Sequence, residues 1–417
     1  MSEWKEYKLG DICRSIADGD HMPPPKSDRG IPFVTISNIV DNRLDFGNTH
    51  FVPQSYYDGL DDKRRPHIGD TIYSVVGTFG KPVYVNDNKP FVFQRHIAIL
   101  RPDESKIVPQ FLYYSLLSPQ FYRKADVMAV GAVQRTISLT SLRKSTINIP
   151  SLNIQSNIVS ILSSLDDKIA VNKKICENLE AQAQALFKHW FVDFAPFFAE
   201  QSGEAERKDG QFVESELGLI HEGWKVGTLG DIAELRKPSI KPQDNILYTH
   251  YSIPAFDNNK KPSIDEGSTI KSNKFGINDG AVLLSKLNPS TKRIWYTGNV
   301  PENSVSSTEF LPFYSINKEY TPFIYCYLNC DSNYREIANG AKGTTNSHQR
   351  IDANSILNHA LAYSEEAIRD FCDCCQSLME MILESNQESF RLASLRDILL
   401  PKLMSGEIKV NDVNEKC

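Results

Sequence analysis

The chain of 417 residues is 41% hydrophobic and 24% charged, and its formal net charge is −6. No apolar run approaches the ~20 residues needed to span a bilayer, which excludes a membrane-spanning helix. The length exceeds one typical core and predicts roughly two to four domains. Because the first residues, MSEWKEYKLGD, lack the apolar segment of a signal peptide, we expect a cytoplasmic location.

The opening of the chain recurs 220 residues later. Residues 4–12 read WKEYKLGDI and residues 224–232 read WKVGTLGDI, so six of nine positions match at identical spacing. Such a match is hard to obtain by chance. It predicts an internal duplication of a whole structural unit.

Short strands are predicted after each opening. They are runs of β-branched and aromatic residues bounded by Gly, Asp, Asn and Pro. They comprise residues 31–39, 70–76, 82–86 and 91–100 in the first half, and residues 281–287, 293–299 and 309–316 in the second.

A helical segment follows the strands in both halves. Residues 108–132 and 321–341 each begin with a Pro suited to the first turn of a helix, continue with aromatic residues, and end in Gly-Ala. The pair Gln134–Arg135 then matches the pair Gln349–Arg350. Because the order is kept throughout, each half is predicted to be an α+β domain.

A long helix is predicted after each domain. Along residues 158–186 the seam positions alternate in steps of four and three for four heptads, the a/d pattern of a coiled coil. The pattern recurs more weakly 213 residues later, where Arg396 interrupts it. Asn172 and Ser385 occupy the same central layer, where a polar residue fixes the register.

We expect these two helices to pair with each other in antiparallel orientation. The alternative is that each helix packs only on its own domain. The residues predicted to pair are Ile158, Leu162, Leu165, Ile169, Asn172, Leu179, Leu186, Leu378, Ile382, Ser385, Leu392 and Leu399.

Charge is segregated along the chain. Lys and Arg outnumber Asp and Glu by 19 to 16 in residues 1–150 and by 15 to 13 in residues 224–363. The helical segments are acidic, with 6 against 12 in residues 151–223 and 6 against 11 in residues 364–417. The negative total therefore does not exclude DNA binding by the two domains.

Two similar domains on a rigid spacer suit duplex DNA, whose equivalent faces recur about every 34 Å. Base edges and phosphates require Arg, Lys, Asn or Gln on loops, although each such residue can equally be an ordinary solvated side chain. The candidates are Lys26, Arg29, Arg64, Arg65, Lys81, Gln134 and Arg135 in the first domain, and Lys260, Lys261, Lys286, Lys292, Arg293, Lys342, Gln349 and Arg350 in the second.

Catalytic patterns are weak. Residues 102–106, PDESK, place Glu104 and Lys106 in the E-x-K spacing of metal-dependent nucleases, but the separate acidic partner is compressed to Asp103. No phosphate-binding P-loop is present in the sequence. We therefore predict no catalytic residue, and a nuclease stays an alternative.

The eight cysteines form no paired framework, which indicates free thiols in a reducing compartment. Cys326, Cys330, Cys372 and Cys375 have the number of thiols that a zinc site needs. The last two lie in a helical pattern, so we expect small buried side chains and no metal.

The chain resembles the specificity subunits of type I restriction-modification enzymes. Three segments carry the resemblance: LFKHWFVDFAPF at 186–197, SELGLIHEGWKVGTLGDI at 215–232, and LRDILLPKLMSGEIKV at 395–410. The resemblance implies two similar α+β target recognition domains separated by two long conserved helices that pair as an antiparallel coiled coil. The implied divisions are recognition domains at 1–150 and 224–363, the central helix at 151–195, a linker at 196–223 and the C-terminal helix at 364–417.

The resemblance also implies the function. Each recognition domain would read one half of a bipartite, asymmetric site in double-stranded DNA. The helices would set the spacer and dock two methyltransferase subunits, which restriction and translocase subunits join. S-adenosylmethionine, ATP and Mg would be bound by those partners, and this chain would catalyse nothing. A coiled-coil scaffold that binds only proteins is a further alternative.

Overall fold

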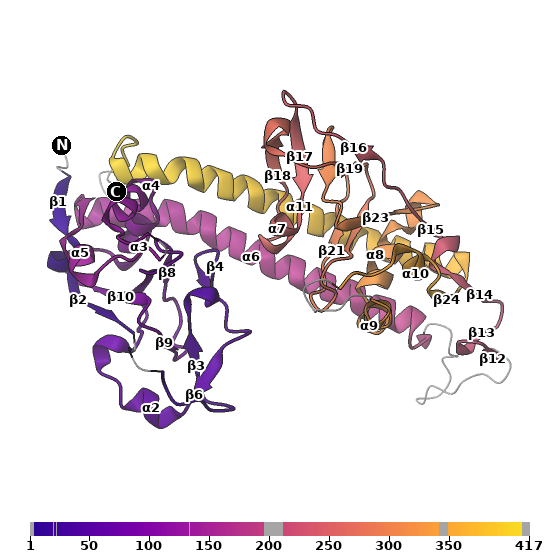
Figure 1. Ribbon diagram of the computed structural model, residues 1–417, viewed down its shortest axis with the longest axis horizontal. Helices are drawn as coiled ribbons and strands as arrows, with labels where there is room; N and C mark the ends of the chain where they lie inside the picture. The colour runs from indigo at the N-terminus through magenta and orange to yellow at the C-terminus, as the bar shows by residue number, and fades with distance from the viewer. Residues whose placement is uncertain are drawn as a thin grey trace, which may run out of the picture. The chain divides into compact units, whose positions relative to one another are not determined.

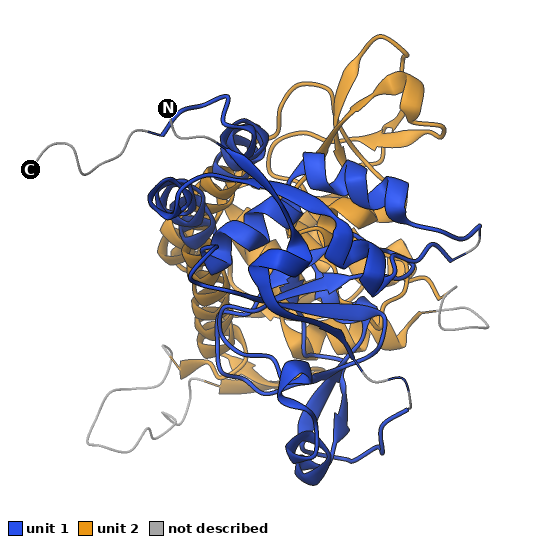
Figure 2. Cartoon of the chain, turned by 90° about the vertical axis from the view of Figure 1, so that its left-hand side faces the viewer, with its two compact units in different colours: residues 1–169, 391–417 blue, residues 170–390 orange. Residues whose placement is uncertain are grey.

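A computed structural model describes residues 4–19, 21, 23–132, 134–195, 212–341 and 349–410 (Figure 1). The chain divides into two compact units, Met1–Ile169 with Arg391–Cys417 and Ala170–Phe390 (Figure 2). Each unit contains one set of strands and a part of each of two long helices. None of the described helices is long and apolar enough to cross a membrane.

Unit 1 is built around a four-stranded antiparallel sheet in the order β2-β10-β7-β8. A three-stranded sheet, β6-β3-β9, contains a parallel β3–β9 pair, and two antiparallel pairs are formed by β1 with β11 and β4 with β5. The strands are β1 (Lys5–Lys8), β2 (Cys13–Asp18), β3 (Ile31–Val34), β4 (Ile39–Val40), β5 (Arg43–Leu44), β6 (His50–Val52), β7 (Thr71–Ser74), β8 (Pro82–Tyr84), β9 (Val92–Phe93), β10 (Ile97–Pro102) and β11 (Thr146–Ile149).

Short helices connect and cover these strands. Pro at the first position and Ser118 at the N-cap begin α4, and Ser138 caps α5. The helices are α1 (Leu9–Ile12), α2 (Gln54–Asp58), α3 (Pro109–Leu117), α4 (Pro119–Met128) and α5 (Leu139–Lys144), with 3-10 turns η1 (Ile36–Asn38) and η2 (Asp62–Arg64).

Unit 2 repeats the main sheet of unit 1. Its four-stranded sheet has the order β15-β23-β20-β21, and its five-stranded sheet has the order β16-β19-β22-β17-β18 with a parallel β17–β22 pair. The strands are β12 (Phe212–Ser215), β13 (Gly218–His221), β14 (Lys225–Thr228), β15 (Ala233–Leu235), β16 (Ser239–Ile240), β17 (Leu247–Tyr251), β18 (Ser263–Glu266), β19 (Lys274–Gly276), β20 (Val282–Ser285), β21 (Ile294–Tyr296), β22 (Ser304–Ser306), β23 (Phe310–Ser315) and β24 (Ala360–Tyr363).

Unit 2 also has short helices and 3-10 turns between its strands. They are η4 (Leu229–Asp231), α7 (Ile253–Asp257), η5 (Gly267–Thr269), η6 (Lys318–Tyr320), α8 (Thr321–Asn329), α9 (Asp331–Asn339) and α10 (Ala353–Leu357). Strand pair β14–β24 corresponds to β1–β11, and α8 and α9 correspond to α3 and α4. The duplication predicted from the sequence is therefore a duplication of the fold.

The repeated LGDI segments pack in the same way in both domains. Leu9 and Leu229 are fully buried in the two cores. A Cβ atom on Gly10 would lie 3.2 Å from the carbonyl oxygen of Arg143 in α5, and one on Gly230 would lie 3.3 Å from that of Leu357 in α10. Because these glycines lack a Cβ atom, α5 and α10 can pack closely against the LGDI segments. The role of the two glycines is therefore structural.

Two long helices, α6 (Leu152–Phe191) and α11 (Glu365–Ser405), pack together in antiparallel orientation. In unit 2, Asn172 Nδ2 donates to Glu388 Oε2 at 2.7 Å, and Cys176 Sγ lies 3.6 Å from the carbonyl oxygen of Ile382. The partner number falls as the number along α6 rises, which establishes the direction. Asn172 Nδ2 also lies 3.4 Å from the Ser385 carbonyl oxygen, so the two polar seam positions meet.

The helices pack on the domains as well as on each other, so the alternative in which each helix contacts only its own domain is wrong. Ile158 and Leu162 belong to the core of unit 1, and Leu179 and Ile382 belong to the core of unit 2. Among the residues predicted to pair, Ile158, Leu162, Asn172, Leu179 and Ile382 are buried, and the remainder, Leu165, Ile169, Leu186, Leu378, Ser385, Leu392 and Leu399, are half-buried.

Candidate nucleic-acid interface

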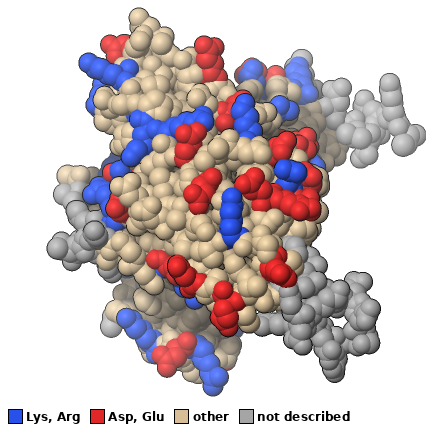
Figure 3. All heavy atoms as spheres, turned by 90° about the vertical axis from the view of Figure 1, so that its right-hand side faces the viewer, with Lys and Arg blue, Asp and Glu red and all other residues tan. Residues whose placement is uncertain are grey.

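Basic and acidic side chains are mixed on the surface. On the face of the chain drawn in Figure 3, Lys and Arg lie beside Asp and Glu. On this face, charge alone does not mark out an interface.

Three loops of unit 1 meet at one end of the four-stranded sheet. They are residues 75–81 between β7 and β8, residues 94–96 between β9 and β10, and residues 134–137. Backbone hydrogen bonds of 2.8 to 2.9 Å join them, from Val75 N to His96 O, from Gly77 N to Arg135 O and from Ile137 N to Val75 O. The candidates Lys81, Gln134 and Arg135 thus belong to one connected surface.

A recess of about 330 Å³ opens beside these loops. Lys26, one of the sequence candidates, lines it together with Phe33, His50, Gln94 and Arg95. Sequence reasoning missed Gln94 and Arg95, because residues 91–100 were expected to form one strand. The signal was the polar sequence Gln-Arg-His inside an otherwise apolar run.

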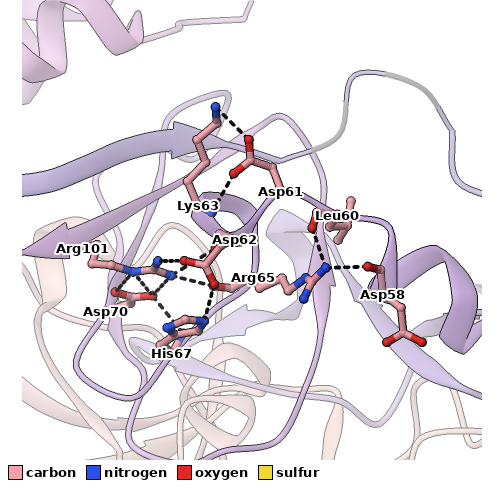
Figure 4. A network of polar contacts seen from close by, with 9 residues as sticks. All are labelled: Asp58, Leu60, Asp61, Asp62, Lys63, Arg65, His67, Asp70 and Arg101. Carbon is pink, nitrogen blue, oxygen red and sulfur yellow. Dashed lines mark hydrogen bonds and ion pairs between the residues drawn. The ribbon is translucent and has the colours of Figure 1, made fainter.

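The loop at residues 61–67 of unit 1 is braced by a polar network (Figure 4). Arg101 donates to Asp62 at 2.6 Å, to Asp70 at 3.1 Å and to the Arg65 carbonyl oxygen at 2.8 Å. His67 lies 3.2 Å from Asp62. Asp70 is almost fully buried, so its charge is compensated where desolvation would be costly.

The network gives Arg64 and Arg65 different roles. Arg65 Nη2 donates to the carbonyl oxygens of Asp58 and Leu60 at 2.5 and 2.7 Å, so this candidate closes its own loop. Arg64 is half-buried and lies 3.8 Å from Asp18.

The other candidates of unit 1 also differ in their engagement. Arg135 pairs with Asp126 at 2.5 Å and its guanidinium carbon lies 5.0 Å from the centre of the Phe79 ring. Lys26, Arg29 and Gln134 are exposed, and Lys81 is half-buried.

Unit 2 brings three candidates together with the same backbone scheme. Lys286 N donates to Glu309 O at 2.9 Å, Asn288 N to Gln349 O at 3.1 Å, and Ile351 N to Lys286 O at 3.0 Å. Arg350 forms two hydrogen bonds of 3.1 Å with the Glu309 carboxylate.

The hydrogen-bond scheme corrects one match made from the sequence. Gly77 bonds to Arg135 in unit 1, and the equivalent Asn288 bonds to Gln349 in unit 2. The isolated bridges Val76–Thr136 and Leu287–Arg350 agree with this register. Arg135 is therefore equivalent to Gln349, and the two Gln-Arg pairs are offset by one residue.

The remaining candidates of unit 2 have partners away from this edge. Lys260 forms a 2.7 Å ion pair with Glu180 of α6, and Lys261 lies 5.9 Å from the centre of the Phe390 ring of α11. These two cations thus contact the long helices. Lys342 lies outside the described residues.

Lys292 and Arg293 lie between β20 and β21, and each forms an ion pair with an acidic side chain. Lys292 pairs with Asp331 at 2.6 Å and lowers the pKa of that carboxyl group. Arg293 pairs with Asp257 at 2.7 Å.

The possible nuclease segment forms a turn. Lys106 Nζ donates to the Asp11 carbonyl oxygen at 2.9 Å and pairs with Asp103 at 3.3 Å, while Glu104 is exposed. Within the described ranges, no group of three His, Cys, Asp or Glu side chains is arranged to hold a metal ion.

The cysteines considered for zinc lie in the core of unit 2. Cys326, Cys330, Cys372 and Cys375 are buried, free thiols. Burial raises the pKa of Cys372 to about 12, and burial with the neighbouring thiols raises the pKa of Cys326. All four are buried side chains of this core, as the sequence pattern predicted.

Comparisons with known proteins agree on one family. The type I restriction modification DNA specificity domain matches residues 1–181. The type I restriction enzyme HindI specificity subunit of Haemophilus influenzae is 25% identical, and the match covers 98% of this chain and all of that protein. The MjaIX specificity subunit of Methanocaldococcus jannaschii is 29% identical, over 74% of this chain and 71% of its own length.

A solved structure shows the same fold. The type I restriction-modification system S subunit from M. genitalium superposes with a TM-score of 0.57 at 16% identity, covering 96% of each chain. Two repeated α+β domains, the antiparallel helices and the full-length sequence match all lead to one assignment. The chain is similar over nearly its full length to the specificity subunits of type I restriction-modification enzymes.

Proposed function

We propose that each unit of this specificity subunit reads one half of a bipartite, asymmetric site in double-stranded DNA. The observation that carries the proposal is the duplicated fold, with four-stranded sheets β2-β10-β7-β8 and β15-β23-β20-β21. Equivalent loops at the ends of these sheets carry different side chains. Two readers with one backbone and different contacts suit two unlike half-sites.

The long helices supply the spacer in this proposal. At about 1.5 Å per residue, the 40 residues of α6 extend about 60 Å, more than one turn of duplex DNA. Asn172 supports a single register, because slippage would remove its amide from Glu388 and Ser385 in a largely apolar seam. A fixed register would give the site a fixed number of unread base pairs.

The partners proposed for the helices are two methyltransferase subunits, with restriction and translocase subunits joining that core. Along α11, Asp and Glu outnumber Lys and Arg by 8 to 4, which offers these partners a surface distinct from the more basic domains. S-adenosylmethionine, ATP and Mg would be bound by the partners, and this chain would contribute the choice of sequence.

Methylation mapping tests the proposal. The full chain, produced with its methyltransferase partner in a host lacking other methylation, should direct methylation to one motif with two specified parts and a constant gap. A continuous motif, or no methylation above the level of the partner alone, would contradict it.

The salt dependence of DNA binding separates the proposal from a protein-only scaffold. Affinity of the complex for duplex DNA should fall by orders of magnitude between roughly 50 and 200 mM salt, because phosphate contacts release counterions. An affinity that does not change with salt, or no affinity, would favour the scaffold.

A further inference from the structure

The turn between β9 and β10 in unit 1 and the turn between β22 and β23 in unit 2 have the same backbone. In both turns, the backbone N–H group of the first residue donates to the strand that runs parallel to the one before the turn, β3 in unit 1 and β17 in unit 2. The carbonyl oxygen of the same residue accepts from the first residue of the strand after the turn. The bonds are Gln94 N to Val34 O (3.1 Å) and Ile97 N to Gln94 O (3.0 Å) in unit 1, and Ser307 N to Tyr251 O (2.9 Å) and Phe310 N to Ser307 O (3.0 Å) in unit 2.

The third residue of each turn is also held by a matching bond. Val75 N donates to His96 O, and the equivalent Lys286 N donates to Glu309 O, both at 2.9 Å. Residues 94–96 are therefore structurally equivalent to residues 307–309. The backbone is the same, but Gln-Arg-His in unit 1 stands where unit 2 has Ser-Thr-Glu.

The side chains of the two turns differ in the sign of their charge. In unit 2, Glu309 accepts two hydrogen bonds from Arg350, so this cation already has an acidic partner. In unit 1, Arg95 is exposed, and among the residues that the structure describes no carboxylate forms an ion pair with it. The Asp18 carboxylate, near the same end of the sheet, is engaged by His21 at 2.8 Å.

The recess in front of the turn has the composition of a reading surface. Gln94 and Arg95 line it with Lys26 and His50, while Phe33 contributes apolar surface. Gln can bond to an adenine edge in two places, and Arg can do the same with guanine. Because the turn is hydrogen-bonded to β3 and to the loop at residues 75–81, these donors are presented from a rigid support, which lowers the entropy lost on binding.

We propose that Gln94 and Arg95 are specificity-determining residues of unit 1, which read base edges in the major groove of the half-site assigned to that unit. Unit 2 reads its half-site without this pair, because its equivalent turn offers Ser307 and Thr308 beside a paired glutamate. This inference rests on the proposed function.

The test uses the full chain with its methyltransferase partner and maps the methylated sites of Gln94→Ala, Arg95→Ala and Arg95→Lys. Discrimination should fall about ten- to a hundred-fold at one or two positions of a single half-site, with the other half and the gap unchanged. Arg95→Lys should relax the same position, because Lys keeps the charge and loses the two-point contact.

A matched control is Lys144→Ala, an exposed cation at the end of α5, which should leave the motif unchanged. Thermal unfolding of each variant shows whether it folds. An unchanged motif in all three variants would overturn the inference, and so would a uniform loss of affinity for every sequence, which indicates a phosphate contact. A wild-type complex that yields no bipartite motif would instead contradict the proposed function.

Discussion

The long helices meet the two domains through different chemistry, although the fold is duplicated. In unit 1, Asp166 of α6 accepts from Tyr114 at 2.8 Å and pairs with Arg396 of α11 at 2.8 Å. In unit 2, the positions 213 residues away from this pair are apolar, with Ala183 on α6 and Met379 on α11, both fully buried.

Aromatic rings occupy the end of the helix pair in unit 2. Phe191 lies 4.8 Å from Phe323 and 5.3 Å from Phe371 between ring centres, and Phe187 lies 5.8 Å from Phe371. One backbone thus accepts a polar bridge at one junction and an aromatic cluster at the other. The stability of the polar bridge depends on complete pairing of its charges, and the stability of the aromatic cluster depends on close packing without cavities.

The largest effect is expected from opening the aromatic junction. Phe371 is fully buried, so Phe371→Ala would leave a cavity and should destabilise unit 2 by about 3–5 kcal/mol. Calorimetry of the full chain should show this loss. Val127→Ala, at a side chain 86% exposed, is the control and should change stability by less than about 0.5 kcal/mol. Equal losses in the two variants would contradict the assignment of this cluster to the core.

A smaller effect is expected from breaking the polar junction. Arg396→Met removes the partner of Asp166 and should cost about 2–3 kcal/mol, below the range for fully buried pairs because both side chains are about a quarter exposed, 25% and 23%. Adding Asp166→Leu should recover part of the loss, since the only carboxylate then left without Arg396 is that of Asp397, which is 60% exposed. If the double variant lost the sum of the single effects, the two residues would be independent.

The smallest effect concerns the hydroxyl group of Tyr114. Tyr114→Phe removes its bond to Asp166 and should cost about 1 kcal/mol at neutral pH. Burial, and then the charge of Asp166, raise the pKa of Tyr114 above its ordinary value of 10.0. The folded chain therefore resists ionisation that the unfolded chain undergoes above pH 10, so this contribution is complete below that pH and is lost above it.

Denaturant unfolding at pH 7 and between roughly pH 9.5 and 11 checks this sign. The stability difference between the wild type and Tyr114→Phe should shrink as the pH rises above 10. A difference that grew with pH would show that the ionised hydroxyl is favoured in the folded chain.

Much of the architecture could be predicted from local pattern. The repeated LGDI segments, the strands and both long helices follow from sequence patterns, and α6 covers the whole of the predicted seam at residues 158–186. Arg396 looked like a defect in the coiled-coil seam because its partner, Asp166, lies 230 positions away in sequence. Only the antiparallel pairing of the helices brings these charges together.

The candidate contacts were less predictable, because residue type indicates what a side chain can bind and not what it already binds. Lys260 and Arg65 were selected as loop cations, yet they hold Glu180 and two backbone carbonyl groups. Gln94 and Arg95 were not selected, because the apolar residues on either side of them predicted one strand where the structure has a turn. Which of the candidates touch DNA stays a prediction.

The central claim is that unit 1 and unit 2 read separate half-sites. Its most direct test replaces residues 1–150 with those of a relative that has a different motif, and maps methylation by the complex. The account predicts that one half of the motif changes to the relative's, while the other half and the gap stay the same. A change in both halves, or in neither, would contradict it.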